Sequence, residues 1–197
     1  MELLGLGAWV LTFILSSLLA SIVEQRFSPF VLQASLLILS VFSIYLLKLR
    51  VPLLKSPLGL LLAFISVPIM ITFYTTVGRR LEDYELEFLP SSPLPKYFLL
   101  LLLAPMAEEA SFRGLLEWSL SFPISIILPA LAFGLVHIMP YGKAPRRSKA
   151  VALSIITVLG FLFSLLSWYY GLVSAMLSHS MTNAVSLIEE RRTRKST

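Results

Sequence analysis

The sequence predicts an all-α fold, a polytopic bundle of transmembrane helices that forms a single domain over residues 1–197. Of these 197 residues, 57% are hydrophobic and only 14% are charged, whereas soluble domains carry about 25% charged residues. The apolar residues also occur in runs of about 20, the length an α-helix needs to cross the hydrocarbon core. We therefore expect seven membrane spans, or eight if one run is divided.

The seven predicted spans follow one another along the whole chain. Prolines stand in or near the first turn of four of them, where a missing backbone N–H costs little. The longest connection, residues 78–94, carries six charged side chains, and we expect a solvated loop there rather than an amphipathic segment on the membrane surface. The predicted spans are residues 3–23, 29–48, 57–77, 95–119, 122–139, 149–168 and 171–188.

The charged residues predict the orientation of the bundle. The net charge is +5, but Lys and Arg lie in short connections and the tail, not on one basic face, so we expect no nucleic-acid partner. With seven spans, twelve of these residues fall on one side and three on the other. By the positive-inside rule, the C-terminus is then cytoplasmic in a protein of the cell membrane. The chain has no cysteine, which excludes disulfides and a thiol nucleophile.

The motif Glu108-Glu109-x-x-x-Arg113 places three charged residues inside the fourth run. Each costs about 2.5–3.5 kcal/mol at bilayer depth, so such residues are candidates for function. Glu109 and Arg113 are four residues apart and can pair on one helix face, a ladder that Glu117 would extend. Glu108 is rotated by about 100° and stays free for chemistry. Pro105 cannot donate to the carbonyl of residue 101, so a kink or a water is expected there.

Both histidines and the single asparagine of the chain also lie in apolar runs. Phe133 and His137 are four residues apart, so the aromatic ring can pack against the imidazole and limit its rotamers. His179 and Asn183 share another helix face. Together with Glu108, these residues can hold and deprotonate a water and then stabilise an oxyanion.

A metal centre is the alternative use of the same residues. Glu108, His137 and His179 are a plausible ligand set for Zn²⁺. The strong zinc signal, two histidines four residues apart around a glutamate, does not occur in the chain. The sequence leaves a zinc mechanism and a metal-free glutamate mechanism equally open.

The motifs Glu108-Glu109-x-x-x-Arg113, Phe133-x-x-x-His137 and His179-x-x-x-Asn183, taken in this order, resemble those of the CPBP family, the CAAX proteases and bacteriocin-processing enzymes. The resemblance covers about residues 95–190, the expected catalytic core. It implies an intramembrane endopeptidase of the CAAX prenyl type. Glu108, assisted by His137, would activate water, His179 and Asn183 would hold the oxyanion, and Glu109 with Arg113 would support them.

The expected activity is therefore cleavage of a C-terminal or membrane-embedded peptide, with the lipid bilayer and a peptide or prenylated protein as partners. Two other functions remain open at this point. An inert scaffold or immunity-type protein could keep these residues to hold helices together. A proton-coupled transporter could use them as a relay, although the chain shows no internal repeat of the kind that many transporters have.

Overall fold

A computed structural model of the chain describes residues 2–77, 89–138 and 145–194, and within these residues the backbone is helical without strands. Short π- and 3₁₀-helical segments (η1, η3, η4 and η5) join some of the α-helices into longer runs. The α-helices are α1 (Glu2–Ser21), α2 (Ser28–Leu46), α3 (Leu58–Leu62), α4 (Ser66–Thr76), α5 (Pro93–Phe98), α6 (Ala104–Glu109), α7 (Ile124–Val136), α8 (Arg146–Tyr170) and α9 (Leu172–Arg194).

The predicted all-helical fold is confirmed, because each predicted span coincides with one continuous helical run. Four runs are long and apolar enough by length and composition to cross a membrane: Glu2–Ser21, Ser28–Leu46, Leu58–Thr76 and Arg146–Tyr170. The number of spans remains a prediction. The charged residues from Arg79 to Glu87, as well as Lys143, lie outside the described residues, and so does the predicted loop over most of its length.

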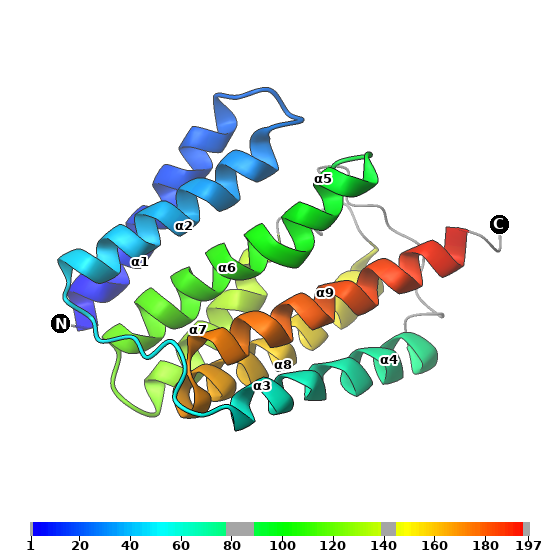
Figure 1. The fold of residues 1–197 in the computed structure, drawn as a ribbon. Helices are drawn as coiled ribbons and strands as arrows, with labels where there is room; N and C mark the ends of the chain where they lie inside the picture. The colour runs from blue at the N-terminus through cyan, green and yellow to red at the C-terminus, as the bar shows by residue number, and fades with distance from the viewer. Residues whose placement is uncertain (1, 78–88, 139–144, 195–197) are drawn as a thin grey trace.

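The helices are arranged around the run that contains α5 and α6 (Figure 1). The antiparallel pair α1 and α2 packs on one side of this run, and α9 packs on the other side. The helices α3 and α4 cover the outer face of α9, while α7 and α8 pack against each other and complete the bundle. Consecutive runs alternate in direction (Figure 1). The helices α6 and α9 lie next to each other near the middle of the molecule.

The fourth run is continuous from Pro93 to Ser119, so the alternative that Pro105 divides it into two helices is wrong. The backbone accommodates this proline by widening one turn. The segment η3 (Leu99–Leu103) is π-helical, and the N–H of Ala104 donates to the carbonyl of Leu99, five residues back. A second π-helical segment, η4, covers Ala110–Leu116. Such π-turns inside helices occur frequently at functional sites.

Small residues allow α7 and α8 to pack closely. A Cβ atom at Gly134 would lie 2.1 Å from the hydroxyl oxygen of Thr157, and one at Gly160 would lie 3.0 Å from the carbonyl oxygen of Ala130. Close approach through small residues is the usual way in which helices associate inside a membrane. It also brings the backbone of α8 near the buried side chains of the fourth run.

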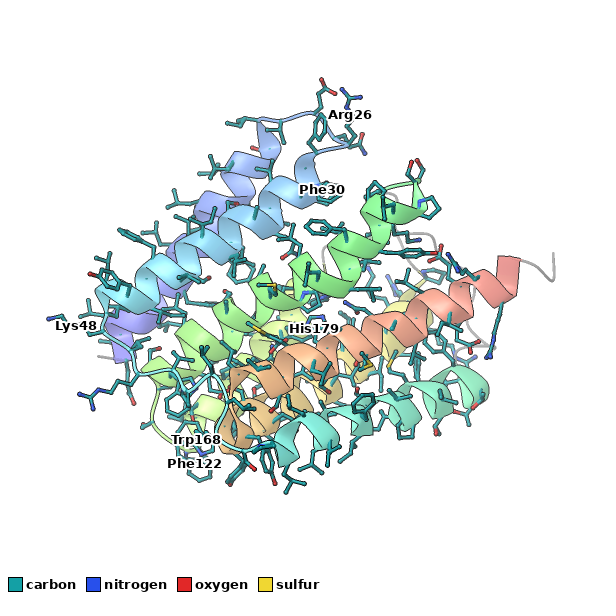
Figure 2. All side chains as sticks on the ribbon, in the orientation of Figure 1. Arg26, Phe30, Lys48, Phe122, Trp168 and His179 are labelled. Carbon is teal, nitrogen blue, oxygen red and sulfur yellow. The ribbon has the colours of Figure 1, made fainter. Side chains whose placement is uncertain are left out.

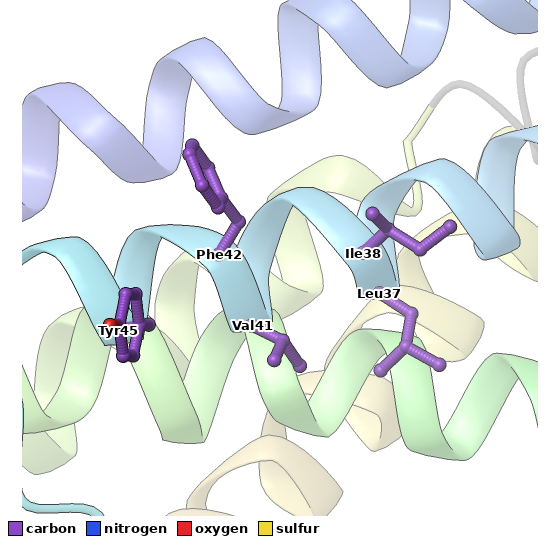
Figure 3. Close-up of a pocket in the computed structure, with 5 residues that line it drawn as sticks. All are labelled: Leu37, Ile38, Val41, Phe42 and Tyr45. Carbon is purple, nitrogen blue, oxygen red and sulfur yellow. The ribbon is translucent and has the colours of Figure 1, made fainter.

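The outer surface of the bundle is apolar. A groove of about 480 Å³ lies along α2 and is lined only by residues of this helix (Figure 3). It contains none of the predicted site residues, and an apolar outer groove suits contact with lipid chains. Its lining residues are Leu37, Ile38, Val41, Phe42 and Tyr45.

Candidate active site

His179 lies near the middle of the bundle, on α9 and next to α6 (Figure 2). Its side chain is 6% exposed. The neighbouring helix α6 ends with Glu108 and Glu109, so two glutamates face the α9 histidine from one helical turn. These three side chains form the centre of the candidate site.

Glu109 connects an arginine to this histidine. Its Oε1 atom lies 3.3 Å from Nη1 of Arg113 and 2.8 Å from Nδ1 of His179, and its Oε2 atom lies 3.3 Å from Nε of Arg113. Both partners of the ion pair are fully buried. A carboxylate can only accept hydrogen bonds, so Nδ1 of His179 carries the proton that points to Glu109. In the neutral imidazole, Nε2 is then free to accept.

Aromatic rings enclose the Arg113 guanidinium. Its Cζ atom lies 4.6 Å from the ring centroid of Phe133, 5.5 Å from that of Phe163 and 5.6 Å from that of Phe112. Its Nη2 atom donates to the carbonyl of Gly160 over 2.8 Å. These contacts offset part of the cost of burying a cation. They also make Arg113 a fixed support for Glu109.

Glu108 is the more accessible of the two glutamates, since its side chain is 14% exposed. Its Oε1 atom accepts a hydrogen bond of 2.9 Å from Nε2 of Gln33 on α2. Its Oε2 atom has no hydrogen-bond partner among the described residues and lies 3.9 Å from Nε2 of His179. This distance is too long for a direct hydrogen bond, but one water can bridge such a gap.

His137 is the C-terminal cap of α7 and keeps helical backbone angles, and the helix ends at Val136, three residues before the end of the predicted span. The last turn tightens, because the N–H of His137 donates to Gly134, three residues back. The carbonyl of Phe133 instead accepts a hydrogen bond of 2.7 Å from Nδ1 of His137. A carbonyl can only accept, so Nδ1 is again protonated.

The ring of Phe133 contacts both histidines. Its centroid lies 4.7 Å from that of His137 and 5.6 Å from that of His179. Phe163 stacks on His179 from another side, with centroids 5.1 Å apart. Within the described residues, His137 makes no direct hydrogen bond to Glu108, His179 or Asn183. The structure therefore groups His137 with the other site residues through an aromatic ring and not through a polar contact.

Asn183 satisfies a carbonyl that the π-turn leaves without a partner. In an α-helix the carbonyl of Leu100 would accept from Ala104, but this N–H donates to Leu99. In a π-helix it would accept from residue 105, which is a proline without an N–H. Nδ2 of Asn183 donates to Leu100 over 2.8 Å, which supplies the missing bond. One N–H of the amide remains for another acceptor.

Glu117 does not extend the ion-pair ladder, contrary to the prediction. It is fully buried, yet neither of its carboxylate oxygens has a hydrogen-bond partner among the described residues. The reason lies in the backbone: the N–H of Glu117 donates to Phe112, five residues back, so η4 changes the α-helical register. In addition, the guanidinium of Arg113 is already occupied by Glu109 and Gly160.

The residues predicted to hold a metal do not gather into a ligand set. In the part of the chain that the structure describes, no group of three or more His, Asp or Glu side chains could hold a metal ion. Glu108 and His179 are close, but His137 lies beyond Phe133. The prediction of a metalloprotease thus has no support from the described residues.

Four partners of the site were not predicted from the sequence. Gln33 contacts Glu108 from a helix that belongs to none of the recognised motifs, although an amide inside an apolar run of the sequence is a signal that could have been followed. The stacking of Phe163 on His179 and the two backbone carbonyls of Leu100 and Gly160 depend on tertiary packing. No pattern in the sequence marks them.

The fold and the site define a helical, multi-pass membrane protein with a buried glutamate–histidine cluster. The family described as type II CAAX prenyl endopeptidase Rce1-like matches residues 90–185, the segment that contains every predicted site residue. Over this segment the chain is similar to the Rce1-like type II CAAX prenyl endopeptidases. At family level, this supports a CAAX-protease-like intramembrane peptidase, a hydrolase. No curated protein and no solved structure matches the chain.

Proposed function

We propose that this protein is an intramembrane endopeptidase in which Glu108 activates a water for attack on a peptide carbonyl. The observation that carries the proposal is the 3.9 Å gap between Oε2 of Glu108 and Nε2 of His179. Both atoms accept hydrogen bonds when Glu108 is ionised and His179 is neutral, so a water between them is held by two bases. The Glu109 carboxylate fixes the orientation of the histidine for this task.

In the proposed reaction, the Glu108 carboxylate takes a proton from the water while the hydroxide oxygen bonds to the scissile carbonyl carbon. The negative charge that develops on the carbonyl oxygen needs hydrogen-bond donors. The second N–H of the Asn183 amide supplies one, while the neutral His179 ring, oriented by the Glu109 carboxylate, accepts the remaining O–H of the attacking water through Nε2. Glu108 then returns its proton to the leaving amine, so that the enzyme ends as it began. His137, which contacts the same Phe133 ring as His179, would assist Glu108.

The substrate that we propose is a peptide with a lipid-anchored C-terminal segment, in keeping with the prenyl endopeptidase family. The test is incubation of the purified protein with a farnesylated CAAX peptide and with the same peptide lacking the lipid, followed by mass spectrometry of the products. We expect cleavage of the farnesylated peptide, and expect it to persist with a chelator. Absence of any cleavage, with a folded protein, would favour an inert scaffold instead.

We also propose that the site opens toward the cytoplasmic half of the membrane and that the C-terminus is cytoplasmic. Asn183 lies eight residues before Arg191, about 12 Å at the α-helical rise, so the site is near the basic end of the bundle. Because the chain has no cysteine, single cysteines can report the topology. Arg147→Cys, at an exposed position, should react with an impermeant maleimide only after permeabilisation, and Ser56→Cys in intact cells. The reverse pattern would overturn this orientation.

A further inference from the structure

One side chain from outside the family segment touches the proposed base. Nε2 of Gln33 donates to Oε1 of Glu108 over 2.9 Å, and Gln33 belongs to α2, whereas the family match begins at residue 90. The buried face of α2 is formed by Pro29, Leu36 and Ser40. Gln33 shares this face, because positions 29, 33, 36 and 40 repeat at helical spacing. The face packs against α6 and both π-helical segments, so α2 is a wall of the site.

The contact has unused hydrogen-bonding capacity, which points to a site and not to a structural link alone. Oε1 of Gln33 and Oε2 of Glu108 are both buried and lack a hydrogen-bond partner among the described residues. Buried polar groups in a purely structural contact are normally satisfied. Here the amide and the carboxylate together offer two acceptors, which suits a place where a water must be held.

We propose that Gln33 is a positioning residue for Glu108, and that α2 thereby completes the active site; this inference rests on the proposed function. A glutamate side chain has three rotatable bonds, so without a partner its carboxylate would sample several orientations. The hydrogen bond to Oε1 selects the one in which Oε2 faces Nε2 of His179 at 3.9 Å. A misplacement of about 1 Å can cost about 100-fold in rate, so this restraint acts on the chemical step.

Gln33→Met tests the inference, because methionine fills a similar volume and has no N–H donor. A hydrogen bond to a charged group is worth about 10- to 100-fold, so we expect kcat for the farnesylated peptide to fall by this factor. KM should stay within about twofold, because the substrate itself does not lose a contact. The matched control is Gln25→Met, which changes the other glutamine of the chain, an exposed residue in the turn before α2. We expect it to leave kcat unchanged.

A second readout does not depend on activity. The infrared carboxylate band of Glu108 is identified as the band that disappears in Glu108→Gln. It should shift in Gln33→Met and stay in place in Gln25→Met, because only the first loses a donor to this carboxylate. A general packing defect would lower the melting temperature without moving this band. If Gln33→Met does not fold, Gln33→Asn replaces it, since the shorter side chain withdraws the donor while it keeps the amide.

The outcomes separate the inference from the function on which it rests. If the wild-type protein cleaves and Gln33→Met cleaves equally well with an unmoved band, the positioning role is wrong and the proposed function stands. If the wild-type protein cleaves no peptide, the proposed function is wrong, and the role of Gln33 in hydrolysis is overturned with it. A fall in kcat together with a shifted band supports both.

Discussion

Glu108 and Glu117 lie on the same helical run, but their surroundings differ. Glu108 is 14% exposed, receives a hydrogen bond from Gln33 and faces His179. Glu117 is fully buried, and its carboxylate oxygens have no hydrogen-bond partner among the described residues. If Glu108 is the base that we propose, burial of a carboxylate in a membrane helix does not by itself indicate catalysis. Oriented hydrogen-bond partners and partial exposure are the features that distinguish Glu108.

The largest expected effect is the loss of activity on substitution of Glu108, the proposed base. Glu108→Ala should lower kcat/KM for a farnesylated peptide by about 100- to 10,000-fold, the usual contribution of a general base. The folded yield should stay close to that of the wild type, because Glu108 is not a partner of Arg113. Turnover would be measured by product mass spectrometry and folding by thermal melting in detergent. An active Glu108→Ala protein would remove Glu108 from the proposed mechanism.

The second largest effect is on stability. It concerns the ion pair of Glu109 and Arg113, which lies between Glu108 and Glu117 in the sequence. Arg113→Ala leaves the buried Glu109 carboxylate and the Gly160 carbonyl without their cation. The loss of one partner of a buried pair costs about 3–5 kcal/mol, so Arg113→Ala should melt at a lower temperature than Glu108→Ala. If both variants melt at the same temperature in detergent, the pair does not support the fold in the way that we infer.

A third prediction tests why Asn183 is needed. Asn183→Ala should destabilise the protein by about 1–3 kcal/mol, because the Leu100 carbonyl loses its hydrogen bond. Pro105→Ala restores a backbone N–H at the π-turn, so the cost of Asn183→Ala should be smaller in this background. Denaturation of the four proteins of this cycle gives the coupling directly. Equal costs in the two backgrounds would show that Pro105 does not leave this carbonyl unpaired.

The sequence predicted the fold well because the membrane imposes a strong pattern. Runs of about 20 apolar residues reveal helices, and each predicted run became one continuous helix. Helix ends and registers were less predictable. The end of α7 before His137 and the altered register at Glu117 result from turns with three- and five-residue hydrogen bonds. These depend on tertiary packing and on prolines whose effect cannot be read from spacing alone.

The grouping of the site residues was predictable only in part. The four-residue spacing of Glu109 and Arg113 indicates a pair, and the pair forms. The contact between Glu109 and His179 joins residues 70 positions apart, so no local pattern contains it. Gln33 is farther still from the recognised motifs. Contacts of this kind are set by which helices become neighbours, and a single sequence does not reveal that.

The smallest expected effect is that of a substitution at Glu117, the second glutamate of the comparison. Glu117→Gln keeps the shape of the side chain and removes a buried carboxylate that has no ion pair within the described residues. We expect kcat/KM to change by less than about twofold, because no hydrogen bond or ion pair joins Glu117 to His179 or Glu108 within the described residues. Stability should change by less than about 1 kcal/mol, the scale of one hydrogen bond. The same assays as for Glu108→Ala apply, with Glu108→Gln as the matched variant.

Glutamine at the two positions gives the sharpest form of the comparison, because the chemical change is identical and only the surroundings differ. At position 108 an amide cannot take a proton from water, so cleavage should be lost although the hydrogen bond with Gln33 can be kept by rotation of the amides. At position 117, where Ser164 and Ser167 are neighbours on α8, the amide meets hydroxyl groups that can bond to it. A loss of activity of 100-fold or more in Glu117→Gln would mean that Glu117 is also needed for cleavage. The proposed difference in role between Glu108 and Glu117 would then be wrong.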